Sequence, residues 1–262
     1  MTSETSHLPP NANLADRRLR LKPPKGPIGR AGRRLKDFME ARVAGWSVLE
    51  DRPVYDSSQF PWAAEIEAEW TKIRAELDGI MSFKDDLPSF HEILSEVGSI
   101  TSDASWKTYF LAGIGMDCTG NAARCPETMR LLSRIPGMKT AFFSILAPGK
   151  HIPPHRGAYC GILRYHLGLI VPEPKEKCRI RIADRYYSWN EGKSLIFDDT
   201  YNHEVWNDTG GHRVVLFVDF ARPLRRPFNR INEAFLNMAS LAPFLREAGG
   251  RQKAWEKKFY RQ

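Results

Sequence analysis

Residues 161–171 read Gly-Ile-Leu-Arg-Tyr-His-Leu-Gly-Leu-Ile-Val, and their side chains alternate between two faces of an extended chain. The odd-numbered positions from 163 to 169 form a face that is wholly apolar or aromatic and must pack against something. Arg164 and His166 share the opposite face. The pattern predicts a strand that carries two basic side chains on one side and core residues on the other.

The same period of two recurs along the chain from Lys139 onwards. The candidate strands are Lys139–Leu146, Gly161–Val171, Lys177–Ala183, Lys193–Phe197, His203–Asn207 and Arg213–Phe220, separated by turns rich in Pro, Gly and Asn. Because no helical segment intervenes, closely spaced strands of this kind favour an antiparallel barrel or jelly roll over an alternating α/β sheet. We expect this β core to cover about residues 138–222.

Helical spacing of apolar residues flanks the β core on both sides. It predicts helices over Arg33–Ala44 and over Trp62 to about Met81, a short helix after Pro126, and a return to helix from Phe228. The fold class is therefore predicted to be mainly β with flanking helices.

The composition is that of a globular protein of 262 residues and 30.0 kDa, 42% of them hydrophobic. No run approaches the roughly 18 apolar residues that cross a bilayer, and no apolar leader stands at the start. The four cysteines are scattered, which favours reduced structural thiols. We expect a cytoplasmic location, with peripheral contact at the inner face of the membrane left open.

The net charge of +8 resides in the two ends of the chain. Residues 1–35 are predicted to be a basic disordered tail, either merely solubilising or a tether to an anionic membrane or nucleic acid. Residues 226–262 are predicted to be a basic helical extension. Its Trp255 and Phe259 could enter a membrane interface or could rest on the domain. Nucleic acid is the weaker partner, because no known recognition module accompanies the charge.

Two histidines on separate strands suggest a metal site. Two prolines lie between His151 and His155 and exclude a helical zinc motif. His203 follows His155 by 48 residues at the start of a predicted strand, so the barrel could bring the two rings together. Two imidazole ligands that leave coordination positions on the metal open are typical of non-haem Fe(II) sites. A pair of histidines without further evidence is more often structural.

Four further polar side chains are predicted to point into the barrel: Arg164, His166, Arg213 and Ser144. Such a set needs an acceptor-rich partner, because an unpaired buried charge costs several kcal/mol. A dicarboxylate such as 2-oxoglutarate meets that need. For Arg213, a surface salt bridge is the alternative.

Residues 55–225 resemble the aspartyl/asparaginyl β-hydroxylase family, and most closely its bacterial branch that hydroxylates acyl chains of lipid A, with ornithine-lipid hydroxylases as neighbours. The resemblance is carried by Met138–Ser144, His155-Arg156-Gly157, Arg164–Leu169, Trp189 with Gly192, Phe197-Asp198-Asp199, His203–Trp206 and Arg213 with Asp219. It implies an oxygenase domain over residues 36–225 with a double-stranded β-helix core. The implied cofactors are Fe(II) and 2-oxoglutarate, with O₂ as co-substrate.

The resemblance also assigns roles to individual residues. His155 and His203 would bind iron, Ser144 and Arg213 would hold the distal carboxylate of 2-oxoglutarate, and Arg164 and His166 would meet its metal-proximal carboxylate. The carboxylate ligand usual in the wider superfamily would fall at Gly157, which has no side chain. Asp198 or Asp199 would accept a hydrogen bond from a metal-bound water, or would only cap the turn before His203. His151 and His212 are expected not to bind metal.

Two substrates remain open at this stage. One is an acyl chain of a membrane lipid, either lipid A or an ornithine lipid. The other is an aspartyl or asparaginyl residue in a peptide or natural-product precursor. A cupin-like binding module without catalysis is a third interpretation. It would predict that some of the six site residues are replaced, but all six are present: Ser144, His155, Arg164, His166, His203 and Arg213.

Overall fold

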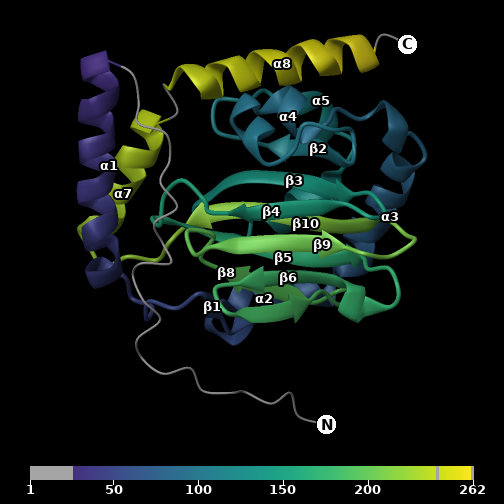
Figure 1. Cartoon of the computed structure of the whole chain (residues 1–262), viewed down its shortest axis with the longest axis horizontal. Coiled ribbons are helices and arrows are strands. Elements are labelled where there is room, and N and C mark those ends of the chain that lie inside the picture. Colours follow the sequence, from purple (N-terminus) through teal and green to yellow (C-terminus); the bar gives the residue numbers. More distant parts are fainter. Residues whose placement is uncertain (1–25, 240–241, 261–262) are drawn as a thin grey trace.

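Two antiparallel sheets form the centre of the computed structural model, which describes residues 26–239 and 242–260 (Figure 1). The larger sheet has the spatial order β1 (Val54–Tyr55), β8 (Ser194–Phe197), β5 (Ile162–Ile170), β10 (Arg213–Ala221), β3 (Met138–Leu146) and β2 (Trp106–Ala112). The smaller sheet has the order β4 (His151–His155), β9 (His203–Asn207), β6 (Cys178–Ile182) and β7 (Arg185–Ser188).

The chain crosses between these sheets at most of its connections. From β3 onwards, β3, β5, β8 and β10 belong to the larger sheet, and β4, β6, β7 and β9 belong to the smaller one. This winding is a double-stranded β-helix, so the predicted jelly-roll core is confirmed. The six predicted strands all occur and end within a residue or two of their expected limits. Strands β1, β2 and β7 were not predicted, and β4 was predicted only as an extended path.

Helices cover the outer face of the larger sheet. Leu163 and Tyr165 of β5 pack there with Trp62 of α2 (Pro61–Ala68) and Ile73 of α3 (Trp70–Met81). The apolar face predicted for residues 161–171 is thus part of the main core. The single helix expected over residues 62–81 is interrupted at Glu69, whose backbone leaves the helical region (φ −113°, ψ 14°).

The remaining helices lie around the edges of the barrel. They are α1 (Gly26–Trp46), α4 (Phe90–Ile93), α5 (Thr119–Ala122), α6 (Pro126–Leu132), α7 (Phe228–Ala239) and α8 (Pro243–Phe259), with short 3₁₀ turns η2 (Ser57–Gln59), η3 (Lys84–Asp86), η4 (Ser95–Ser99) and η5 (Lys175–Lys177). Figure 1 shows α1 and α7 together at one end of the sheets and α8 across one side.

The predicted disordered tail is wrong over its last ten residues, because α1 begins at Gly26 rather than near Arg33. Its Met39 and Val43 are buried with Leu236 of α7, and this apolar contact orders a segment whose local composition favours disorder. Residues 1–25 lie outside the described part of the chain. The predicted extension over residues 226–262 contains α7 and α8.

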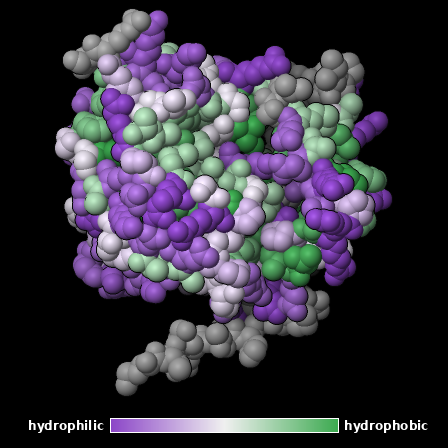
Figure 2. Space-filling model, turned by 180° about the vertical axis from the view of Figure 1, so that it is seen from behind, coloured by the Kyte–Doolittle hydropathy of each residue, from purple (hydrophilic) through white to green (hydrophobic). Residues whose placement is uncertain are grey.

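A membrane-spanning helix needs a certain length and hydropathy. None of the helices within residues 26–239 and 242–260 is both long and apolar enough to cross a bilayer. Figure 2 shows the side opposite to that of Figure 1, where hydrophobic residues are interspersed with hydrophilic ones.

Candidate active site

His155 and His203 meet inside the barrel because their strands pair in register. His155 at the end of β4 lies opposite His203 at the start of β9, and the ring centroids are 4.1 Å apart. Each Nδ1 lies close to a backbone carbonyl, that of Pro153 at 2.8 Å and that of Tyr201 at 2.9 Å. A carbonyl only accepts, so both Nδ1 atoms carry the proton. Both Nε2 atoms are then left with a free lone pair, as in metal-binding histidines.

Burial keeps both rings neutral. It lowers the pKa of His155 to about 4 and lowers the pKa of His203 well below its usual value. For His203, the neighbouring His155 and Arg164 act in the same direction. Neutral imidazole is the form that binds a metal ion.

Asp199 occupies the space where residue 157 would carry a side chain. A Cβ at Gly157 would lie 2.0 Å from Asp199 Oδ2, and the Gly157 N–H donates to the Asp199 carbonyl at 2.7 Å. In the described residues, no group of three or more His, Cys, Asp or Glu side chains is arranged to hold a metal ion. The absence of a side chain at Gly157 therefore leaves room for the Asp199 carboxylate two residues after His155.

Arg164 lies between two carboxylates. Its Nη2 is 2.8 Å from Asp199 Oδ2, its Nε donates to Asp219 at 2.9 Å, and its guanidinium lies 4.2 Å from the centre of the Phe217 ring. These carboxylates raise the pKa of Arg164, whereas burial raises the pKa of Asp199 above its usual range. The expected role of Arg164, contact with an incoming carboxylate, did not include these two partners.

Arg213 is buried without a carboxylate partner. Arg213 is 2% exposed, and it forms no ion pair with any residue that the structure describes. Nη1 donates weakly to Ser144 Oγ at 3.5 Å, the guanidinium lies 4.5 Å from the centre of the Trp189 ring, and Nε has no partner. Burial lowers the pKa of Arg213 to about 10. The surface salt bridge considered for Arg213 is therefore wrong.

His166 is the second buried group that lacks partners. Neither of its ring nitrogens has a hydrogen-bond partner among the described residues, and the ring centre lies 5.0 Å from that of Phe217 and 5.1 Å from that of Phe197. Burial lowers its pKa well below the usual value, and Arg213 and Arg164 act in the same direction. Buried polar atoms are nearly always hydrogen-bonded, so His166 and Arg213 together mark a place that suits an anion with several acceptors.

Asp198 has a structural role distinct from that of Asp199. It forms a buried ion pair with Arg222, and it accepts hydrogen bonds from the N–H and hydroxyl of Thr200. Of the two aspartates left open by the sequence, Asp199 is the one beside Gly157 and Arg164. His151 faces outward, where it contacts Glu204 at 2.7 Å and stacks on Trp206.

Three residues near the site were not assigned a role from the sequence. Trp106 donates its indole N–H to Ser144 at 2.9 Å, Trp189 covers Arg213, and Asp219 pairs with Arg164. The alternation of β10, in which positions 213, 215, 217 and 219 share a face, could have placed Asp219 opposite Arg164. Trp106 could not have been found in this way, because β2 was not predicted.

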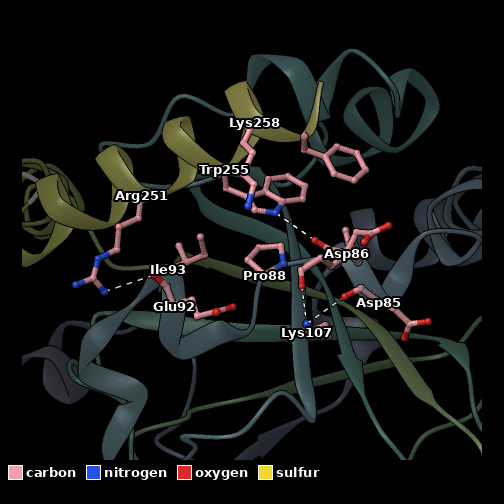
Figure 3. A pocket seen from close by; sticks show the side chains of 11 residues that line it. Asp85, Asp86, Pro88, Glu92, Ile93, Lys107, Arg251, Trp255 and Lys258 are labelled. Carbon is pink, nitrogen blue, oxygen red and sulfur yellow. Dashed lines mark hydrogen bonds between the residues drawn. The ribbon is translucent and has the colours of Figure 1, made fainter. Parts of the chain in front are cut away.

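A pocket of about 450 Å³ lies outside the barrel, between α8 and the η3–α4 segment (Figure 3). Figure 3 shows Lys107 and Trp255 across it, both donating to backbone carbonyls, and none of the six predicted site residues lines it. All four cysteines are free and buried, in agreement with the predicted reduced thiols.

The fold and the site define a double-stranded β-helix protein with a two-histidine candidate metal site. The family model described as aspartyl/asparaginyl β-hydroxylase matches residues 67–223, and the chain belongs to this family.

Individual relatives agree with this assignment. The chain is 50% identical over 215 residues to the ornithine lipid ester-linked acyl 2-hydroxylase of Rhizobium tropici, covering 82% of this chain and 76% of that protein. It is 35% identical over 170 residues to human aspartyl/asparaginyl β-hydroxylase, covering 63% of this chain and 22% of the human protein. A prolyl-4-hydroxylase structure from Pseudomonas putida is 16% identical, with a TM-score of 0.38 over 58% of this chain and 86% of that one. The two relatives aligned by sequence, from Rhizobium tropici and human, support a hydroxylase.

Proposed function

We propose that this chain is an Fe(II)- and 2-oxoglutarate-dependent hydroxylase that acts on an acyl chain of a membrane lipid. The observation that carries the proposal is a pair of buried groups with unsatisfied hydrogen-bonding atoms, Arg213 and His166, in the same barrel as two neutral imidazoles with free Nε2 atoms. The rings of His166 and His203 both pack against Phe197. A cation buried without a counter-ion is unfavourable unless a ligand supplies one. The residues present therefore fit both the metal and the diacid.

His155 and His203 would hold the metal, while Arg213 and the Ser144 hydroxyl would bind the distal carboxylate of 2-oxoglutarate. Trp106 holds Ser144 in place, and Trp189 keeps one face of the Arg213 guanidinium dry. His166 and Arg164 would meet the other carboxylate. Fe(II) and 2-oxoglutarate, when bound, supply the activation of O₂ for hydroxylation of an unactivated C–H bond.

Asp199 would accept a hydrogen bond from a water on the metal, since it occupies the space above Gly157. Arg164 orients Asp199 through a contact of 2.8 Å and is itself oriented by Asp219. An incoming carboxylate would therefore meet an Arg164 that is already partly neutralised. That leaves Arg213 as the stronger anchor.

An ornithine lipid is the preferred substrate, rather than lipid A, because the 50%-identical relative is named for that activity and this chain spans 76% of it. The second candidate is an aspartyl or asparaginyl side chain, which the similarity to human aspartyl/asparaginyl β-hydroxylase favours. If the substrate is an ornithine lipid, the protein would make peripheral contact with an anionic membrane surface.

The test compares substrates in detergent micelles containing Fe(II), ascorbate and 2-oxoglutarate. We expect succinate to form in step with a gain of about 16 Da on an ornithine lipid, the mass of one oxygen. Mild alkaline hydrolysis cleaves the ester bond, and the fatty acid that it releases should carry the added oxygen. The His155→Ala variant is the control and should form neither product. Oxygen gain on an aspartate-containing peptide but on no lipid would establish the second candidate instead.

A further inference from the structure

Most of the exposed hydrophobic side chains belong to α1 and α7 or to segments next to these helices in the sequence. Of the described residues, the large hydrophobic ones that are most exposed are Leu35, Phe38, Val48, Tyr186, Ile231, Met238 and Phe244. All except Tyr186 lie on α1, on α7, in the first turn of α8 or directly after α1. Phe38 is 49% and Met238 50% exposed. Such clustering is typical of an interaction site.

α1 and α7 form one surface because their inner faces are packed together. Trp46 of α1 stacks on Phe228 of α7 at 4.4 Å, and Met39 and Leu236 are buried in the same cluster. The two helices lie side by side in Figure 1, and each carries large hydrophobic side chains that are exposed. We call the outer faces of these two helices the α1–α7 surface.

Exposed arginines accompany the apolar residues on these two helices. Arg30, Arg34 and Arg42 are exposed on α1, and Arg230 is exposed on α7. The Arg42 guanidinium lies 3.6 Å from the centre of the Phe38 ring. Two acids on these helices are paired: Asp37 of α1 lies 3.7 Å from Lys36, and Glu233 of α7 pairs with Lys139. Arginine stems can lie along apolar surface while their charged ends reach outward.

The α1–α7 surface is joined to the segment that follows the candidate metal ligand His155. Glu40 of α1 accepts hydrogen bonds from Lys36 and Arg156, both at 2.9 Å, and Lys36 also donates to the Ala158 carbonyl at 3.2 Å. From α7, Asn232 accepts from the Tyr159 hydroxyl at 2.8 Å. The surface therefore lies next to the end of the barrel that carries the two histidines.

We propose that the α1–α7 surface docks on an anionic lipid bilayer and brings the histidine end of the barrel to the lipid headgroups. This inference rests on the proposed lipid substrate and adds where the membrane lies. Cationic helices with exposed apolar residues bind at the interface of anionic membranes. A second copy of the chain fits this surface less well, because it would bring two arginine clusters together.

The C-terminal part of α8 is not the inserting face. Trp255 stacks on Phe259 at 4.8 Å, and its indole N–H donates to the Asp86 carbonyl (Figure 3). Phe259 packs against Phe83 with ring centres 5.0 Å apart. Of the two sequence interpretations of these aromatics, the structure supports the one in which they rest on the domain. The lysines of α8 therefore provide a matched control for the arginines of α1.

The test is flotation of the full chain with vesicles of phosphatidylcholine alone or with 30 mol% phosphatidylglycerol, a composition chosen for the assay as roughly that of an anionic leaflet. We expect binding to the anionic vesicles only, weakening as salt rises. Arg34→Glu with Arg42→Glu should weaken binding at least about 25-fold, from roughly fivefold for each positive charge lost. Lys253→Glu with Lys257→Glu changes the net charge equally and should weaken it far less.

A third variant tests the apolar part of the surface. Leu35→Gln with Phe38→Gln should weaken vesicle binding at every salt concentration, because these side chains would enter the interface. Equal losses from the α1 and α8 charge variants would overturn the proposal, as would a salt-independent dimer in place of vesicle binding. Hydroxylation of lipid in detergent micelles is measured in parallel. If it persists without vesicle binding, only the docking surface fails; vesicle binding without hydroxylation contradicts the proposed function instead.

Discussion

Replacing Arg213 with methionine should leave the ligand-free protein at least as stable as the wild type, although Arg213 is only 2% exposed. Burial lowers its pKa to about 10, from a usual value of about 12.5. At about 1.4 kcal/mol for each tenfold change in proton affinity, the buried charge costs the folded protein roughly 3 kcal/mol. The side chain is charged in the folded and the unfolded chain at pH 7, so this cost applies in full there.

The contacts that the substitution removes are weak. The hydrogen bond to Ser144 is 3.5 Å long, and the contact with the Trp189 ring is 4.5 Å. Together they contribute about 1–2 kcal/mol. We therefore expect the free energy of unfolding of the Arg213→Met variant to equal that of the wild type or to exceed it by about 1–2 kcal/mol.

Arg222→Met is the matched control. Arg222 is also 2% exposed, but it pairs with Asp198, donates to the Tyr55 hydroxyl at 2.9 Å and donates to the Cys160 carbonyl at 2.8 Å. Its removal leaves a buried carboxylate unpaired, which typically costs about 3–5 kcal/mol. The two substitutions are chemically identical, so a difference between them reports the environment of each guanidinium.

The assay is urea denaturation at pH 7.5 in the presence of Mn²⁺, with and without 2-oxoglutarate. At a concentration of 100 times its Kd, the ligand should stabilise the wild type by about 2.7 kcal/mol and the Arg213→Met variant not at all. The reasoning is refuted if Arg213→Met destabilises the ligand-free protein as much as Arg222→Met does. It is equally refuted if the variant keeps the full gain from 2-oxoglutarate.

The remaining predictions concern the metal site, its two neighbouring aspartates and a buried cysteine. His203→Ala should lower the affinity for Co²⁺, measured by calorimetry, at least about 100-fold, because one imidazole is a poor metal site; unchanged affinity would contradict the ligand assignment. Asp198→Asn should cost about 3–5 kcal/mol in urea denaturation, because it leaves Arg222 unpaired. Asp199→Asn should instead lower Co²⁺ affinity about 10–100-fold with a smaller loss of stability, and the opposite order would exchange the two roles. Burial raises the pKa of Cys118 to about 12, so its reaction with a disulfide reagent at pH 8 should be at least about 1000-fold slower than that of a free thiol until the protein unfolds. The free energy of unfolding should accordingly fall as the pH rises above about 9, since the unfolded chain then loses a thiol proton that the folded chain keeps.

The β core was accessible from local pattern, because half-buried strands must alternate. The period of two in β3 and β5 placed Ser144, Arg164 and His166 on the inner face before any pairing was known. Strand β2 escaped prediction because Trp106 and Phe110 face the barrel while Tyr109 and Leu111 face the helices. A strand that is apolar on both faces carries no alternation.

Residues 26–35 illustrate the opposite limit. Their charge, glycine and proline content favours a disordered tail, yet α1 includes them because Met39 and Val43 further along the same helix are buried against the domain. Local composition reports what a segment can bury by itself. It does not report what a distant helix such as α7 offers it.

The residue types of the site, and the faces of the strands that carry them, were determined by the sequence alone. Tertiary structure decided which of them meet: β4 pairs with β9 and sets His155 against His203, and Asp199 rather than Asp198 reaches the space above Gly157. It also decided that Arg164 has two carboxylate partners, whereas Arg213 has none within residues 26–239 and 242–260. Whether a charge is paired depends on side chains far away in the sequence, and only the packed barrel brings them together.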